Sequence, residues 1–139
     1  MVERPALGYG VRHVALLVRD LAACEHFYVE LLGMQVEWRP DSENVYLTSG
    51  GDNLALHQAR ADGKRDEAAQ RLDHIGIFVA SPEAVDAWFA WLGEHGVRMR
   101  AAPRNHRDGA RSFYCHDPDG TLVQFIHHPP VSRWERDPK

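Results

Sequence analysis

Two short segments of the chain, residues 12–18 and 73–79, alternate between aliphatic side chains and other residues. Alternation with a period of two predicts a β-strand with one buried face. Each segment carries a histidine at its second position, and the step from His13 to His74 aligns the two segments at an offset of 61 residues. The aliphatic positions then coincide: Val14, Leu16 and Val18 match Ile75, Ile77 and Val79.

Each predicted strand leads into a pattern typical of an amphipathic helix. Asp20 and Ser81 are residue types that cap helix N-termini, and Pro82 is favoured in a first helical turn. Glycines that suit C-terminal caps follow in both copies, at position 33 and at 93 or 96. The apolar helix faces repeat at the same offset, as Cys24, Phe27, Tyr28 and Leu31 and then Val85, Trp88, Phe89 and Leu92. This agreement indicates an internal duplication.

Each copy ends in a predicted β-hairpin. Residues 44–48 and 53–58 flank a Gly-Gly turn, and residues 111–116 and 121–127 flank a Pro-Asp-Gly turn. The predicted fold is therefore α+β, with two tandem βαβββ modules that form curved mixed sheets around a cavity. The expected parts are an N-terminal extension (1–10), the first module (11–58), a charged linker (59–71), the second module (72–128) and a tail (129–139) with Trp134 as a candidate anchor.

The hairpin turns also predict which residues lie opposite one another. Four-residue turns pair Asn44 with His57 and Tyr46 with Ala55 in the first module. In the second they pair Phe113 with Gln124 and Arg111 with Ile126. Directly paired residues share a sheet face. His57 and Gln124 are then expected at equivalent places, on the concave face that His13 and His74 also share.

Composition excludes several classes of function. The 139 residues have a net charge of −4 with basic residues spread along the chain, so a nucleic-acid partner is not expected. No apolar run is long enough to cross a membrane and no signal-peptide pattern precedes the first strand, so we expect a cytoplasmic protein. Cys24 and Cys115 lack a metal-binding or disulfide spacing and are expected to be buried free thiols, with Cys115 on the cavity side.

Four side chains are expected to converge in the cavity: His13, His57, His74 and Gln124. Three imidazoles and an amide oxygen can hold a divalent ion such as Zn²⁺, Ni²⁺, Mn²⁺ or Fe²⁺. The alternative is that the histidines line the cavity and bind a ligand or the backbone without metal. Around them, Tyr46 and Phe113 are candidate walls for a ring-bearing substrate, and Arg111 is either an anion-binding group or a solvated strand-edge side chain.

The chain resembles the vicinal oxygen chelate superfamily of glyoxalases, fosfomycin-resistance enzymes, extradiol dioxygenases and bleomycin-resistance proteins. The resemblance rests on residues 13–21, on Phe27-Tyr28 with Leu31-Leu32-Gly33, on residues 74–79 and on Asp117-Pro-Asp-Gly120. It implies metal ligands at His13, His57, His74 and Gln124. The family carries Glu at the last position, and Gln can neither ionise nor act as a base.

The resemblance implies a metal-dependent enzyme of lyase, isomerase, transferase or dioxygenase type. Such an enzyme binds a small substrate through two neighbouring oxygens and stabilises negative charge on them, with Gln124 as a weak ligand or a water-positioning group in the catalytic site. The alternative is a metal-free protein that sequesters a small molecule or antibiotic, as bleomycin-resistance proteins do. A structural or regulatory role ranks third. A homodimer is expected, since family members pair modules within a chain or across a dimer.

Overall fold

The computed structural model describes residues 2–4, 11–60 and 72–130 and divides the chain into two compact units, residues 1–62 and 63–139. Most of the expected N-terminal extension and linker lies outside the described residues, as does the tail from position 131 with Trp134. Each unit has a four-stranded mixed sheet and a helical segment that follows its first strand, which confirms the predicted fold class of two βαβββ modules.

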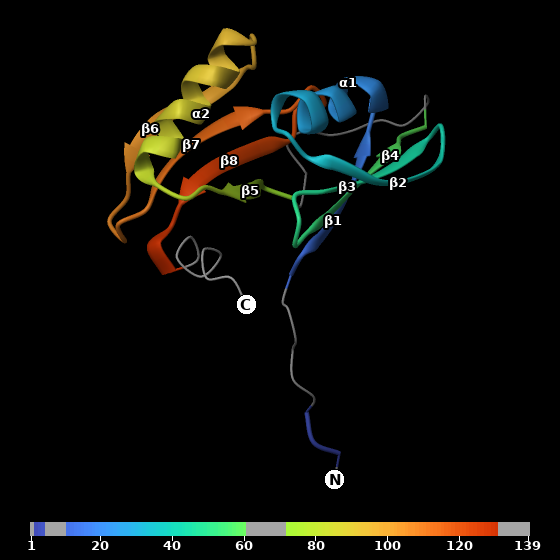
Figure 1. Ribbon diagram of the computed structural model, residues 1–139, viewed down its shortest axis with the longest axis horizontal. Coiled ribbons are helices and arrows are strands. Elements are labelled where there is room, and N and C mark those ends of the chain that lie inside the picture. The colour runs from blue at the N-terminus through green and yellow to red at the C-terminus, as the bar shows by residue number, and fades with distance from the viewer. Residues whose placement is uncertain (1, 5–10, 61–71, 131–139) are drawn as a thin grey trace. The chain divides into compact units, whose positions relative to one another are not determined.

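The first unit runs from β1 (His13–Val18) through a helical segment to a three-stranded meander (Figure 1). Helix α1 (Leu21–Glu25) continues directly into the π-helical turn η1 (His26–Leu31), and β2 (Gln35–Asp41), β3 (Asn44–Thr48) and β4 (Asn53–Gln58) follow. The strand order is β1-β4-β3-β2, with β1 parallel to β4 and the other pairs antiparallel.

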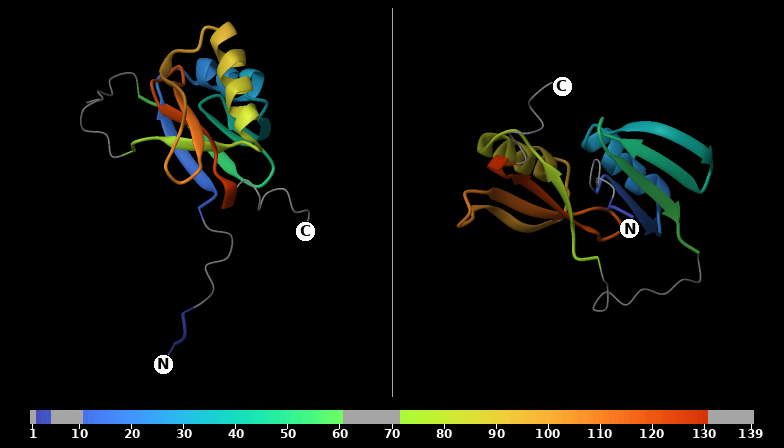
Figure 2. Two further views of the ribbon diagram at one scale, coloured as in Figure 1. Left: turned by 90° about the vertical axis from the view of Figure 1, so that its left-hand side faces the viewer. Right: turned by 90° about the horizontal axis from the view of Figure 1, so that it is seen from below.

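The second unit repeats this topology. Its elements are β5 (Ile75–Phe78), α2 (Pro82–Glu94), β6 (Met99–Asn105), β7 (Arg111–His116) and β8 (Leu122–His127), in the strand order β5-β8-β7-β6. Helix α2 contacts β6, β7 and β8 and lies along one face of this sheet (Figure 2).

The helix ends form as the sequence predicts. Asp20 accepts a hydrogen bond from the backbone N–H of Ala23 at 3.0 Å, and Ser81 accepts one from that of Ala84 at 3.1 Å. Beyond the C-terminal ends, Gly33 and Gly96 have φ angles of 88° and 73°, in the left-handed region that favours glycine. In the second copy Gly96 therefore has the capping conformation, and Gly93 is the penultimate residue of α2.

In each unit the aliphatic strand face and the helix form the core. Cys24, Phe27 and Tyr28 are all at most 2% exposed in the first unit. In the second, the Phe113 ring stacks on Phe125 at a centroid distance of 4.9 Å and meets Phe89 of α2 edge-on at 5.4 Å. We call the opposite side of each sheet, turned away from its helix, the open face. It carries His13, Ala15, Leu17, Asn44, Tyr46, Asn53, Ala55 and His57 in the first unit and His74, Gly76, Tyr114 and Gln124 in the second.

One hairpin register was predicted correctly and the other was wrong by one residue. Asn44 pairs with His57 and Tyr46 with Ala55, as expected. In the second hairpin Gln124 pairs with Tyr114, because the connection has five residues rather than four and His116 pairs with Leu122. The Asp117 carboxylate accepts hydrogen bonds from the N–H groups of Asp119 and Thr121 at 2.8 and 2.9 Å, which retains Thr121 in the turn.

Candidate functional site

His13 lies at the start of β1 on the open face of the first sheet. Its Nδ1 atom is 2.7 Å from Oδ1 of Asn53, which pairs with it across the parallel strands. An amide oxygen can only accept, so Nδ1 of His13 carries the hydrogen and Nε2 carries the lone pair in the neutral ring. The imidazole borders a polar hollow of ≈ 580 Å³ that is lined by Arg12, His13, Glu37, Thr48, Gly50, Gly51, Asp52 and Asn53.

His74 is the equivalent residue of the second unit, immediately before β5. Its Nδ1 atom is 2.6 Å from Oδ2 of Asp73, so a carboxylate accepts the Nδ1 hydrogen. The ring meets Tyr114 edge-on at a centroid distance of 5.5 Å. A histidine that donates Nδ1–H to an oxygen in this way has its tautomer and orientation fixed, with Nε2 left to bind a metal ion or a ligand.

Gln124 lies on β8 beside β5 and pairs with Gly76 on one side and Tyr114 on the other. His74 precedes Gly76 by two residues, so His74 and Gln124 occupy neighbouring positions of one open face. The structure thus brings together two of the predicted site residues within the second unit.

His57 does not stand where the sequence placed it. Ala15 pairs with Ala55, whereas its counterpart at the offset of 61, Gly76, pairs with Gln124. Ala55 is therefore the structural equivalent of Gln124, and the predicted equivalence of His57 is wrong. The prediction counted residues from the hairpin turns, and the connection in the second hairpin is one residue longer than assumed. The parallel pairs β1–β4 and β5–β8 decide which residues of the two units are equivalent, and counting from a turn does not reveal these pairs.

His57 is also distant from His13 within their own sheet. His13 pairs with Asn53 and Leu17 with His57, so the two histidines are four residues apart along neighbouring parallel strands. At about 3.3 Å per residue this is about 13 Å, too far for two side chains perpendicular to the sheet to bind one ion through N–metal bonds of about 2.1 Å.

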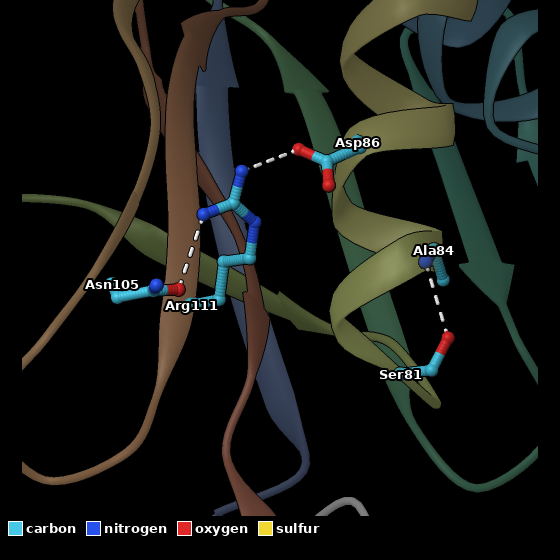
Figure 3. Close-up of polar contacts among 5 residues, drawn as sticks. All are labelled: Ser81, Ala84, Asp86, Asn105 and Arg111. Atoms are coloured by element: carbon cyan, nitrogen blue, oxygen red, sulfur yellow. Dashed lines mark hydrogen bonds and ion pairs between the residues drawn. The ribbon is translucent and has the colours of Figure 1, made fainter.

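Arg111 and Phe113 lie on the helix face rather than the open face, because of the register correction. Phe113 is fully buried in the aromatic stack of the core. Arg111 forms an ion pair with Asp86 of α2 at 2.7 Å and donates a hydrogen bond to Asn105 at 3.1 Å (Figure 3). The expected positions of both as cavity residues are thus wrong, and Tyr114 occupies the open-face position beside Gln124 that was predicted for Phe113.

Cys115 shares the helix face and is fully buried. Burial, with a smaller contribution from the nearby Asp117 carboxylate, raises the pKa of its thiol to about 12. The expectation of a buried free thiol is confirmed, whereas its expected cavity-side orientation is wrong. A thiol in this environment stays protonated at neutral pH and is a poor nucleophile.

An aromatic row crosses the open face of the first sheet. Tyr46 is stacked against Trp38 of β2, with ring centroids 5.1 Å apart and planes 22° apart, and its edge meets the His57 ring at 5.8 Å. The register predicted for Tyr46 is confirmed by its pairing with Ala55, and Trp38 is an addition that was not predicted from the sequence. Trp38 could have been assigned to the open face only from its pairing with Tyr46 across β2 and β3. The register of β2 shifts on both sides of Trp38, so simple alternation along the strand does not predict which face Trp38 occupies.

The donor atoms suit a borderline divalent ion, although their number in each unit is small. Two imidazoles with oriented Nε2 atoms and one amide oxygen are a donor set that such ions accept. Among residues 2–4, 11–60 and 72–130, no three His, Cys, Asp or Glu side chains cluster closely enough to hold a metal. Within the second unit His74 and Gln124 are the neighbouring donors, and His13 is the oriented imidazole at the start of β1 in the first unit.

The chain belongs to the Glyoxalase/Bleomycin resistance protein/Dioxygenase superfamily, whose family model matches residues 10–125. Metallothiol transferase FosB of Staphylococcus epidermidis is 30% identical over 116 residues, which are 83% of this chain and 81% of that protein. Catechol-2,3-dioxygenase of Bacillus subtilis is 27% identical over 132 residues, and the chain spans 44% of its length. No helix within the described part of the chain is long and apolar enough to cross a bilayer.

Solved structures show the same fold. A glyoxalase/dioxygenase from Nostoc punctiforme superposes with a TM-score of 0.76 at 23% identity, over 93% of this chain and 97% of that one. A lactoylglutathione lyase from Agrobacterium tumefaciens superposes with a TM-score of 0.70 at 22% identity, over 86% and 93% of the two chains.

Proposed function

We propose that this protein is a divalent-metal-dependent enzyme that binds a small substrate through two neighbouring oxygens. The observation that carries the proposal is the matched construction of His13 and His74. Both lie at the start of the first strand of a unit, on the open face, and both have Nδ1 held by an oxygen acceptor. A ring held in this way is prepared to bind a metal through Nε2.

In this proposal His13 and His74 are the imidazole ligands and Gln124 is either a weak third ligand or the group that positions a water molecule. When bound, the ion would act as a Lewis acid that neutralises charge developing on substrate oxygen. His57 lies outside this ligand set because of its distance from His13. Tyr46 and Tyr114 form ring walls on the two open faces, and they favour a substrate with apolar or aromatic parts.

The named relatives support an enzyme without fixing the reaction. One relative, 30% identical, is a metallothiol transferase and another, 27% identical, is a catechol dioxygenase, so the proposal covers transferase, lyase, isomerase and dioxygenase chemistry. We further propose that the protein acts as a cytoplasmic homodimer.

A second candidate function is metal-free binding of a small molecule, and the chemistry at position 124 favours it. Neither Gln124 nor its structural equivalent Ala55 supplies a carboxylate, so the proposed donor set is neutral. A neutral set attracts a divalent ion less strongly than one with a carboxylate.

Metal analysis of the purified chain separates the two functions. The enzyme proposal expects about one equivalent of transition metal per chain, removable by chelator and restored by adding Zn²⁺, Ni²⁺, Mn²⁺ or Fe²⁺. His13→Gln and His74→Gln should each abolish this binding. His95→Gln is the matched control, because His95 bonds to the Trp91 carbonyl at the end of α2. Metal that is absent and cannot be added back would decide for the metal-free binder.

A further inference from the structure

His57 is held by a chain of two hydrogen bonds that ends on a carboxylate. The side-chain nitrogen of Asn44 donates to Oδ1 of Asp41 at 2.8 Å, and Oδ1 of Asn44 lies 2.5 Å from Nδ1 of His57. Because a carboxylate only accepts, the amide nitrogen of Asn44 must face Asp41 and its oxygen must face the imidazole. Nδ1 of His57 therefore donates, and Nε2 of the neutral ring is an acceptor.

His13 is held by the same arrangement, an asparagine that bridges a carboxylate and the imidazole. Asn53 donates to Oε2 of Glu37 at 2.9 Å and accepts from Nδ1 of His13 at 2.7 Å. The two relays, Asp41–Asn44–His57 and Glu37–Asn53–His13, use different strands of the same sheet and place both imidazoles on the same open face.

Other histidines of the described chain are bonded differently. His95 and His116 contact the backbone carbonyls of Trp91 and Gly120, and His106 contacts the hydroxyl of Ser112. The relay is therefore a feature of the two open-face histidines in the first unit, one of which is a proposed metal ligand.

The turn between β2 and β3 explains part of the second relay. Oδ1 of Asp41 also accepts from the backbone N–H of Glu43 at 2.8 Å, which is ordinary turn chemistry. These two hydrogen bonds hold the pKa of the Asp41 carboxyl below its usual value, so the relay ends on an ionised group at neutral pH. A turn does not require its Asn to orient an imidazole on the next strand, and this contact carries the functional inference.

The ring of His57 adjoins an aromatic surface. Tyr46 meets it edge-on, and Trp38, stacked on Tyr46, is 58% exposed. An oriented acceptor beside aromatic rings suits a ligand that has a planar ring and a hydrogen-bond donor. The distance from His13 makes this site separate from the proposed metal centre.

We infer that His57, Tyr46 and Trp38 form a recognition site for a planar ring that bears an O–H or N–H group, with Nε2 of His57 as the acceptor. Asn44 is a positioning residue that fixes the tautomer of His57. The inference rests on the proposed function only in taking the open face as the ligand surface, and it specifies the part of the substrate that lies away from the metal.

The first test is the tautomer of His57 in the full chain, treated with chelator and labelled with ¹⁵N-histidine. Nitrogen–proton correlation spectra at pH 8 should show both His13 and His57 with hydrogen on Nδ1. Asn44→Leu should release only His57 into a mixture of tautomers, and Asn53→Leu should release only His13, so each variant controls for the other. Hydrogen on Nε2 of His57 in the unaltered chain would overturn the inference without any variant.

The second test uses phenol as the probe and anisole, which lacks the O–H, as its matched control. Phenol should bind the metal-free chain about tenfold more tightly than anisole, which is the size of one hydrogen bond to an oriented acceptor, and should shift the Nε2 resonance of His57. His57→Phe retains the aromatic ring and should remove this preference.

Equal affinities for the two probes, no binding of either, or a preference that survives His57→Phe would each overturn the recognition site. Because no metal is present in these measurements, their failure leaves the metal-binding proposal standing. Conversely, a chain that never binds metal could still show the phenol preference.

Discussion

The two units have equivalent histidines whose Nδ1 atoms donate to different hydrogen-bond acceptors, which we call the supports of these histidines. His13 and His74 occupy the same position of the same topology, but a neutral amide accepts from the first and an exposed carboxylate from the second. The next equivalent pair has diverged completely, with Ala55 in one unit and Gln124 in the other. The histidine position on the open face is therefore the same in both units, whereas the groups that surround it differ.

The largest change in stability should come from substitutions in β7, where the register of the second hairpin decides which side chains face the helix. Phe113→Ala removes a fully buried ring between Phe125 and Phe89 and should lower the free energy of unfolding by about 3–5 kcal/mol. Tyr114→Ala, one residue further along, removes an open-face ring and should cost about 1 kcal/mol. Urea unfolding of both variants measures the difference, and the reverse order would show that the two side chains had been assigned to the wrong faces.

The local parts of this fold could be predicted from the sequence. Asp20 and Ser81 cap their helices through contacts three residues away, and the Gly-Gly turn sets the first register within four residues. The register of the second hairpin could not be predicted in this way, because the hydrogen bond from the Thr121 N–H to the Asp117 carboxylate adds one residue to the turn. That single residue moved Arg111, Phe113 and Cys115 from the open face to the helix face.

The candidate site, like the fold, could be predicted from the sequence only in part. His13, His74 and Gln124 were predicted as site residues from the repeat and the family resemblance, and the structure places each of them on an open face. His57 was assigned by counting from the turns, but the β1–β4 and β5–β8 parallel pairs join segments far apart in sequence. The supporting residues Asn53, Asn44 and Asp73 belong to no motif, and only the hydrogen bonds reveal them.

The next largest effect, on metal affinity, should come from placing a carboxylate at position 124, whose equivalent in the first unit is Ala55. Gln124→Glu adds a charged donor beside His74 and should raise the affinity for Zn²⁺ by about 10- to 100-fold, the range of hydrogen-bonding and ligand interactions made by a charged group. His57→Glu adds the same charge at the position that the sequence had equated with Gln124, and it should change the affinity little. Competition with a chelating dye measures both. A larger gain from His57→Glu would place the metal centre at the other end of the first sheet.

The two histidine supports should differ in their effect on metal binding. Asp73→Ala removes a charged acceptor and should weaken Zn²⁺ binding by about tenfold, at the low end for such partners because water competes at this exposed carboxylate. Asn53→Ala removes a neutral acceptor and should weaken it by a smaller factor. Calorimetric titration of metal into both variants compares them, and equal losses would mean that the charge of the support does not matter.

The smallest effect should come from Arg111, whose ion pair with Asp86 joins β7 to α2 on the helix face. The Asp86 side chain is 53% exposed, so water screens the pair, and Arg111→Met should lower the free energy of unfolding by less than about 1 kcal/mol. Asp86→Asn should have a similar effect, and the double variant should lose less than the sum if the two side chains interact. Because Arg111 faces the helix, neither change should alter metal or phenol binding. A strong loss of binding in Arg111→Met, with Asp86→Asn unaffected, would instead return the guanidinium to the ligand site that the sequence first suggested.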